Sequence, residues 1–458
     1  MYFRDAIEGI YMEKTCFVKK GLLIGLGFAG LSLSANAAAE TLRGALIQTL
    51  QSNPNILVTV KDRYAIGEEL RQAKAGYLPT LDATAGYGYE HTDNPFTQSS
   101  QLDGSTTKRL MRKEAGLAAN EMLFDGFDTP SEVNRNQARV CSANYKIWGT
   151  AQDTALSAVE SYLKVRAEQQ FVEKAQSNVD THQTVFGLIK QRNESGIDQS
   201  ADVDQTQGRL SLARTNLKAE QANLDDAKSN YLQVVGSMPH NLSAPGAIDS
   251  RYLPKTEAQA IQMAIANHPL LKSAKQDMLA ACAQHQSSLS KNYPRFDLQL
   301  KAERDKDIDG LEGRNYDDQA MVRMNYNLYH GGADKARQDQ TAYLYQESAE
   351  VMHKTYRQVV NNVQLSWNDW QVAQKRLPLL KQHRDAALKT FQAYKQQFLL
   401  NKRTLLDSLD AQNEYYDADR AYTQGQFDVE FGKYRVLNAV GNLIQAEHIG
   451  IPHSDTTA

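Results

Sequence analysis

Four short segments of the chain alternate apolar and polar residues with the period of two that is typical of β-strands. The clearest are residues 81–90 and 296–303, and a return segment follows each of them, at residues 114–124 and 320–328. We therefore expect two hairpins. Segments of about ten residues with this pattern fit strands that cross a membrane in a barrel. An ordinary antiparallel sheet with one wet face fits the same pattern equally well.

The residues that join the two strands of each hairpin are polar and charged. They cover residues 91–113 and 304–319. We expect both stretches to form loops beyond the ends of the strands, which in a membrane barrel would be external loops.

Beyond each hairpin, apolar residues recur at a spacing of three and four. Residues 172–189 and 377–398 show this spacing, and residues 210–231 carry leucine or tyrosine at every seventh position. Such patterns are typical of coiled-coil helices. A continuous helix over residues 131–193 would be roughly 95 Å long. Helices of this length predict an extended bundle, a fibre or a conduit rather than a compact domain.

The chain repeats itself. The stretch from Ala45 to Pro54 resembles the stretch from Ala260 to Pro269, and Asp202 and Asp407 are also in equivalent places. A single ten-residue length change in the first hairpin reconciles the two offsets. We expect each half to contain the same order of helix, strand, loop, strand, long helix, break and long helix.

The N-terminus reads as a targeting segment. Lys14, Lys19 and Lys20 precede the apolar run at residues 21–33, and the small residues at 35–37 fit a cleavage site. This order is typical of a secretory signal peptide. The expected organisation is therefore a signal peptide at 1–39, a first repeat at 40–247, a second repeat at 248–445 and a polar tail at 446–458.

Composition narrows the possible functions. The net charge of −3 and the pI of about 6.4 provide no basic surface for nucleic acid. After removal of the signal peptide only Cys141 and Cys282 remain, which does not make a disulfide framework. The histidines are scattered, and no zinc, phosphate-loop or nucleophile-elbow motif occurs in the mature chain. We expect no cofactor, no metal site and no enzymatic activity.

The number of predicted strands also limits how many chains a membrane barrel would need. Four strands cannot close a barrel alone, because about eight is the smallest closed number. An open sheet edge in lipid leaves backbone groups unsatisfied at a cost of several kcal/mol each. If the strands enter a membrane, the chain must therefore oligomerise. Two copies would supply eight strands and three would supply twelve, and this arithmetic alone does not choose between them.

Several motifs within residues 40–445 resemble those of the TolC family of outer-membrane factors. They are Asn53-Pro54, GYLPTLD at 76–82, LFDGF at 123–127, SGIDQSADVDQTQGRL at 195–210 and NKRTLLDSLDAQNEY at 401–415. The resemblance implies a homotrimer in the outer membrane of a Gram-negative bacterium. Its 12-stranded β-barrel would continue as a 12-helix α-barrel through the periplasm. The implied partners are a periplasmic adaptor (membrane fusion protein), an inner-membrane transporter of the ABC type and outer-membrane lipid.

Residues 213–227 and 234–239, together with the first-half motifs, look most like the branch that serves type I secretion of large adhesins. The resemblance thus implies a passive export channel for protein. An outer-membrane channel of a multidrug efflux pump is the alternative within the same fold. A soluble periplasmic coiled-coil structural protein is the alternative of another class.

The resemblance also implies a periplasmic gate at the turns that follow the long helices. Asp407 and Asp410 match aspartates that ring the family's constriction, and Arg403 matches an arginine that ties neighbouring helices shut. Asp202 matches a partner of that arginine, and Phe398 replaces a tyrosine whose hydroxyl helps to hold the closed state. Rings of carboxylates select cations. Without the resemblance, the same residues read as solvated charges at a helix start.

A few other side chains carry expectations. Trp367 and Trp370 are three positions apart on one helix, so we expect them to pack between helices. His182 lies on a seam and should be packed or face a pore. The aromatic residues of a membrane belt would be Tyr87, Tyr89, Phe96, Tyr326 and Tyr329.

Overall fold

The computed structural model describes residues 39–99, 107–197, 199–400 and 402–450. The predicted signal peptide, except for its last residue, and the end of the predicted tail lie outside these residues. In chain order the elements are α2 (Leu42–Ser52), α3 (Pro54–Ala75), β1 (Thr80–Thr92), α4 (Pro95–Ser99), β2 (Lys108–Phe124), α5 (Asp128–Glu194), α6 (Ser200–Val235), α7 (Glu257–Asn267), α8 (Pro269–Ser288), the 3-10 turn η2 (Leu289–Asn292), β3 (Arg295–Ile308), β4 (Leu311–Asn325), α9 (Ala333–Leu399), α10 (Leu405–Ala439) and α11 (Leu443–Ala446).

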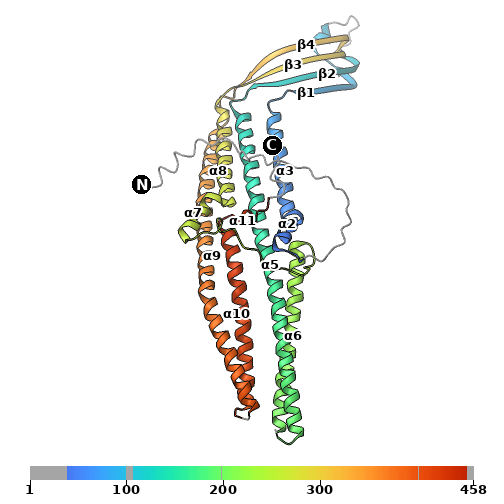
Figure 1. The fold of residues 1–458 in the computed structure, drawn as a ribbon. Coiled ribbons are helices and arrows are strands. Elements are labelled where there is room, and N and C mark those ends of the chain that lie inside the picture. The colour runs from blue at the N-terminus through green and yellow to red at the C-terminus, as the bar shows by residue number, and fades with distance from the viewer. Residues whose placement is uncertain (1–38, 100–106, 198, 401, 451–458) are drawn as a thin grey trace, which may run out of the picture. The chain divides into compact units, whose positions relative to one another are not determined.

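The order of elements occurs twice (Figure 1). Each half has a short helix, a second helix, two strands, a helix of 67 residues and a helix of 35 or 36 residues. A helix break at Asn53 and one at His268 precede the prolines that begin α3 and α8. Proline suits this position because the first N–H groups of a helix have no partner within it. The exact repeat boundaries stay predictions.

The chain folds into two compact units, and each contains parts of both halves. The first unit comprises the described parts of Met1–Asp62, Asn144–Ser273 and His353–Ala458, and the second comprises Arg63–Ala143 and Ala274–Met352. The long helices α5 and α9 contribute residues to both units.

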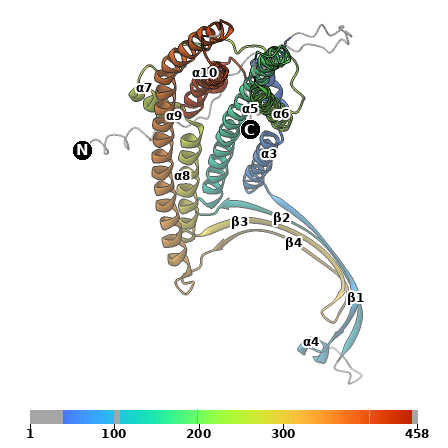
Figure 2. The same ribbon diagram turned by 90° about the horizontal axis from the view of Figure 1, so that it is seen from below.

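The second unit contains one antiparallel sheet, curved along its strands (Figure 2), in the order β1-β2-β3-β4. Strand alternation gives this sheet two different faces. One, here called the apolar face, contains Leu81, Ala83, Ala85, Tyr87, Tyr89, Met111, Lys113, Ala115, Leu117, Ala119, Phe296, Leu298, Leu300, Ala302, Arg304, Lys306, Arg314, Tyr316, Asp318, Ala320, Val322 and Met324. The other, here called the polar face, contains Asp82, Thr84, Gly86, Gly88, Glu90, Arg112, Glu114, Gly116, Asp297, Gln299, Lys301, Glu303, Asp305, Asp317, Gln319 and Arg323.

The expected loop at residues 304–319 is wrong, because β3 and β4 run on through it. The two strands pair from Arg295 with Asn325 to Ile308 with Leu311, and only a tight turn joins them. Arg304 binds both carboxylate oxygens of Asp318, at 2.7 and 3.0 Å, on the sheet itself. Cross-strand ion pairs of this kind stabilise a sheet, so charged residues continue the strands. The first loop is also shorter than expected, since β1 reaches Thr92, α4 follows it, and β2 begins at Lys108.

The LFDGF motif forms the corner between β2 and α5. The carboxylate of Asp125 accepts hydrogen bonds from the backbone N–H groups of Asp128 and Thr129 at 3.0 and 2.7 Å, which caps the helix start. Gly126 has a φ of +74°, and a Cβ there would lie 2.5 Å from the carbonyl oxygen of Ser290. Only glycine fits such a position.

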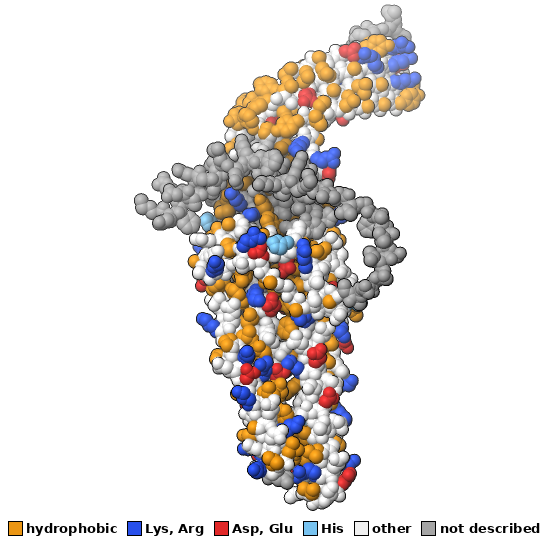
Figure 3. All heavy atoms as spheres, viewed as in Figure 1, with side chains coloured by type: hydrophobic (Ala, Val, Ile, Leu, Met, Phe, Trp, Pro, Cys, Tyr) orange, Lys and Arg blue, Asp and Glu red, His pale blue; other side chains and the backbone are white. Residues whose placement is uncertain are grey.

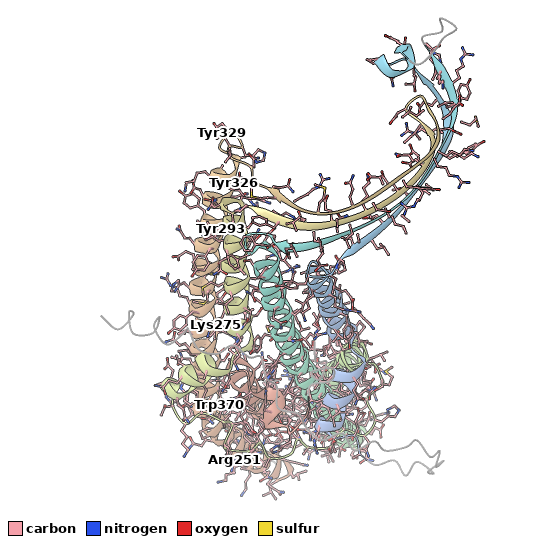
Figure 4. All side chains as sticks on the ribbon, turned by 90° about the horizontal axis from the view of Figure 1, so that it is seen from above. Arg251, Lys275, Tyr293, Tyr326, Tyr329 and Trp370 are labelled. Carbon is pink, nitrogen blue, oxygen red and sulfur yellow. The ribbon has the colours of Figure 1, made fainter. Side chains whose placement is uncertain are left out.

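Several aromatic side chains gather where the strands meet the helices. Figure 4 shows Tyr293, Tyr326 and Tyr329 at this end of the sheet. Phe124 and Phe127 lie edge to face at a centroid distance of 5.3 Å, and Tyr293 lies within 6.4 Å of both. The belt assignment itself stays a prediction, and the side chain of Phe96 lies outside the described ones.

The predicted helical seams are confirmed in the first unit. Ala175, Val179, Leu210, Ala213 and Leu217 form a buried cluster between α5 and α6. Along α9, the predicted positions from Leu377 to Phe398 are buried or half-buried, and the helix continues through Pro378.

The two tryptophans also lie as expected. Trp367 and Trp370 are buried and meet edge to face at 5.4 Å, against Val436 and Val440 of the α10 end. Figure 4 shows Trp370 among the helices of this unit. Neither Cys141 nor Cys282 forms a disulfide bond within the described residues. None of the helices in the described ranges is both long enough and apolar enough to span a membrane.

Candidate gate at the helix turns

The two turns that carry the predicted gate residues lie at one end of the first unit, between α5 and α6 and between α9 and α10 (Figure 1). At the first turn Gly196 takes a φ of +73°, and the N–H of Ile197 returns to the carbonyl of Arg192 at 2.8 Å. At the second, the N–H of Lys402 returns to the carbonyl of Gln397 at 2.8 Å. Both turns thus close the C-terminus of a long helix with backbone hydrogen bonds.

Asp202 and Asp407 occupy the same place in their helices, the third residue of α6 and of α10. The backbone N–H of Gln199 donates to the Asp202 carboxylate at 3.4 Å. The backbone N–H of Asp407 donates to the hydroxyl of Thr404 at 3.2 Å. A negative charge in the first turn of a helix is favourable because the N-terminus carries a partial positive charge. Both aspartates therefore have a local structural role.

Arg403 ties the end of α9 to the start of α10. Its Nε donates to the amide oxygen of Gln397 at 2.8 Å, and its guanidinium lies 3.8 Å from the ring centroid of Tyr394. The Asp407 carboxylate is 3.5 Å away. Within the described part of a single chain, Arg403 pairs with Asp407 and not with Asp202.

Asp410 reaches across to the other helix pair. Arg209 of α6 donates to its carboxylate at 2.9 Å. The Asp410 side chain is 57% exposed. Exposed ion pairs contribute about 0–1 kcal/mol, so this bond positions the helices more than it stabilises them.

Phe398 makes an apolar contact close to both turns. It lies against a buried cluster of Ile189, Leu405 and Leu409, and the guanidinium of Arg192 is 5.6 Å from its ring centroid. This cluster joins residues of α5, α9 and α10. Phe398 thus connects the two turns by apolar contact.

Sequence reasoning missed the polar contacts that join α10 to α5 and α6 above the turns. Arg420 donates to Glu220 at 3.0 Å, and its guanidinium lies 4.6 Å from the ring centroid of Phe171. Lys174 forms an ion pair with Asp419. Gln412 donates to Asn178 at 3.0 Å, also between α10 and α5. These partners are some 200 residues or more apart in the chain, and nothing in the local sequence pairs them.

His182 of α5 is packed between helices, which is one of the two positions expected for it. It is buried, and burial lowers its pKa; the nearby positive charge of Arg209 acts in the same direction, while a hydrogen bond to Asn413 of α10 opposes both. The imidazole is therefore neutral near pH 7 and belongs to the contact between α5 and α10.

Among the residues that the structure describes, no three His, Cys, Asp or Glu side chains gather in a way that could hold a metal ion. What the turns provide is a concentration of carboxylates at the start of α6 and α10, held by arginine and by apolar packing. Such an arrangement can attract cations, and its contacts can break if the helices separate.

The sequence profile of the family described as "Outer membrane efflux protein" matches residues 45–237 and 260–431. The chain belongs to this outer membrane efflux protein family. The predicted resemblance to TolC-type proteins and the predicted outer-membrane location are thereby confirmed, and the reading as a soluble periplasmic coiled coil is wrong. This efflux family member extends from the outer membrane into the periplasm and is an outer-membrane efflux channel of the TolC type.

Its relatives include efflux and secretion proteins. The outer membrane efflux protein BepC of Brucella suis is 26% identical and covers 92% of this chain and 90% of its own. The outer membrane protein TolC of Escherichia coli is 22% identical and covers 94% and 87%. The proteases secretion protein PrtF of Dickeya chrysanthemi is 23% identical and covers 90% and 89%.

Solved structures show the same fold. A membrane protein from Pseudomonas aeruginosa superposes with a TM-score of 0.77 at 15% identity, over 88% of this chain and 90% of that one. The CmeC outer membrane channel of Campylobacter jejuni gives 0.77 at 10% identity, over 93% and 94%. The predicted fold, mainly helical with four strands per chain, is confirmed.

Proposed function

We propose that three copies of this efflux family member form one passive duct across the outer membrane and the periplasm. The observation that carries the proposal is the four-stranded sheet, whose apolar face is exposed and whose outer strands β1 and β4 each have only one neighbour in the described chain. In lipid, edges of this kind must pair with other copies. Two copies would supply about eight strands, and the interior of an eight-stranded barrel is filled by side chains. Three copies leave a lumen.

The polar face of the sheet would line this lumen. Carboxylates outnumber basic residues on it, and Arg112 is bound there by Glu90 at 2.9 Å and by Asp309 at 3.3 Å. An acidic lining is wet and favours cations. The energy for transport would come from an inner-membrane transporter, so the chain needs no catalytic residue of its own.

Native mass spectrometry of the purified protein, together with conductance in planar bilayers, tests the assembly. A trimer that conducts is the expected result. A stable monomer or dimer, or protein that inserts without conducting, would contradict it.

The cargo we propose is a polypeptide such as a large adhesin, exported by a tripartite type I secretion system with a periplasmic adaptor and an ABC-type transporter. Two secretion proteins among the relatives, PrtF and the alkaline protease secretion protein AprF of Pseudomonas aeruginosa, support it. The match to BepC favours the second candidate, the outer-membrane channel of a multidrug efflux pump. A deletion strain separates the two: loss of a surface protein supports secretion, and gain of drug sensitivity alone supports efflux.

We further propose that the helix turns form the periplasmic gate. In a trimer, Asp407 and Asp410 would place two rings of carboxylates around the bore, and Asp202 would be free to meet Arg403 of a neighbouring copy. The gate would open when α10 leaves α5 and α6. This would break the contacts of Arg209, Arg420 and Phe398 described above.

A further inference from the structure

The apolar face of the sheet is not apolar along its whole length. It begins near the helices with Phe296 and Met324 and continues with leucine, valine and alanine. At the far end, beside the β3–β4 turn, one row of directly opposed residues is basic: Lys113 of β2 faces Lys306 of β3, which faces Arg314 of β4. Figure 3 shows Lys and Arg side chains gathered at this end of the sheet and hydrophobic side chains along the rest.

One contact confirms that Lys113 of the basic row belongs to the apolar face, and a second shows the same for Arg304 in the neighbouring row. The ammonium group of Lys113 lies 5.6 Å from the ring centroid of Tyr87, and the guanidinium of Arg304 lies 5.1 Å from that of Tyr316. Both tyrosines are well exposed, at 71% and 60%. Tyrosine beside a cation is the combination expected at a membrane–water interface.

Arg112 and Lys301 on the polar face have carboxylate partners, but the basic row largely lacks them. On the polar face Lys301 binds Glu303 at 2.5 Å. In the basic row, Lys306 is 3.9 Å from Asp307. Within the described ranges no carboxylate comes within ion-pair distance of Lys113 or Arg314. Three neighbouring cations on one row are therefore available to an external anion.

The position of the row determines which anion can reach it. The strand from Phe296 to Lys306 has the length of about 9–11 residues that a tilted strand needs to cross a bilayer. The chain enters and leaves the sheet through periplasmic helices at the Phe296 end, so the basic row lies at the outer surface of the outer membrane. It faces lipid there, at the level of the headgroups.

We propose that Lys113, Lys306 and Arg314 form a binding site for the phosphates of a multiply phosphorylated glycolipid in the outer leaflet. The acyl chains of this lipid would lie along the apolar residues below the row, and its sugar would lie against Tyr87 and Tyr316. Arginine and lysine are the side chains that recognise phosphate, and several of them together are typical of sites for anionic lipids. The proposal rests on the outer-membrane location and on the proposed barrel, in which the apolar face meets lipid, and not on the cargo or the gate.

The test uses the full-length protein in lipid nanodiscs, with bis-phosphorylated lipid A as the probe and native mass spectrometry as the readout. Each basic residue near an anionic surface strengthens binding about five-fold, so the triple variant K113Q/K306Q/R314Q should bind roughly 100-fold more weakly. The charge-preserving variant K113R/K306R/R314K should bind like the parent. The variant K301Q/R323Q, on the opposite face of the same sheet, is the matched control and should also bind like the parent.

A second measurement needs no variant: the parent protein should bind dephosphorylated lipid A as weakly as the triple variant binds the intact lipid. Unchanged binding in the triple variant, or an equal loss in the control variant, would overturn the proposal. So would displacement of the lipid by millimolar inorganic phosphate, which would indicate a simple anion site, or binding that depends on Mg²⁺ instead of on the three cations. Conductance is expected to stay unchanged in the triple variant and in the charge-preserving variant, because their three residues lie on the face opposite the proposed lumen.

Discussion

Arg209 of α6 donates a hydrogen bond of 2.9 Å to the carboxylate of Asp410 on α10. It joins the helix pair of the first half to that of the second half at the end where both pairs turn. Above it, Arg420 and Glu220 make the reverse connection, with the arginine on α10 and the acid on α6. The two pairs differ in burial, and this difference leads to the first prediction.

Replacing Arg420 with Gln should open the gate more than replacing Arg209 with Gln. Glu220 is only 10% exposed, whereas Asp410 is 57% exposed. A hydrogen bond to a buried charged group is worth about 1.5–3 kcal/mol, and an exposed ion pair about 0–1 kcal/mol. Single-channel recordings in planar bilayers should show a larger gain in open probability for R420Q.

The control for this comparison is Arg435→Gln. Arg435 also lies on α10, but it donates to Asp369 of α9, within its own helix pair, at 2.7 Å. Equal recordings for R420Q and R435Q would show that the contact between the pairs does not hold the gate.

The double variant D407N/D410N should conduct cations less selectively and should be blocked less by multivalent cations. Carboxylate rings concentrate cations in a narrow bore, and the amides keep the shape without the charge. Reversal potentials in a salt gradient, with and without a trivalent cation, measure both effects. Asp428→Asn, on the same helix but farther from the turn, is the control. If the two variants behave alike, the carboxylates do not lie at the constriction.

Acid should loosen the contact between α5 and α10 through His182. Burial lowers the pKa of His182 below its ordinary value near 6.5, so the unfolded chain binds this proton more readily than the folded one. The stability contribution is complete above about pH 6.5 and is lost as the pH falls toward the folded pKa. His182→Gln should make the urea midpoint depend less on pH between about pH 7 and pH 5.

Burial also lowers the pKa of His268, so part of the acid sensitivity should remain in the His182 variant. An equally steep loss of stability in His182→Gln and in the parent protein would exclude His182 as the cause.

Gly126→Ala should destabilise the corner between β2 and α5 by about 1–3 kcal/mol, because the added Cβ would meet the Ser290 carbonyl oxygen and the positive φ disfavours alanine. The heat-induced loss of the folded oligomer on a gel measures this. Gly208→Ala is the matched control: this glycine lies within α6 with open space around it, so alanine should stabilise the helix by about 0.5–1 kcal/mol. The reverse order of heat stability would contradict the assignment.

The sequence by itself determined the elements and the family. Strands and helices could be predicted because their backbone geometry sets a local period. This period appears in the period-two segments, in the three-and-four spacing of α5 and α9 and in the doubled motifs. The equivalence of Asp202 and Asp407 could also be predicted from the sequence, because each aspartate follows a turn formed by residues next to it in the chain. The loop predicted at residues 304–319 was wrong because charged side chains usually indicate a loop, whereas the ion pair between Arg304 and Asp318 forms only when β3 and β4 lie side by side.

Only the tertiary structure decided which distant residues meet. The partners of Arg209, Arg420 and Lys174 each lie on another helix, some 200 residues or more away in the chain. The sequence alone does not show which opposite charge each of these residues will pair with. The basic row of Lys113, Lys306 and Arg314 likewise exists only through the register of three strands from two different hairpins. Register depends on the pairing of whole faces, which is a property of the folded sheet and not of any one segment.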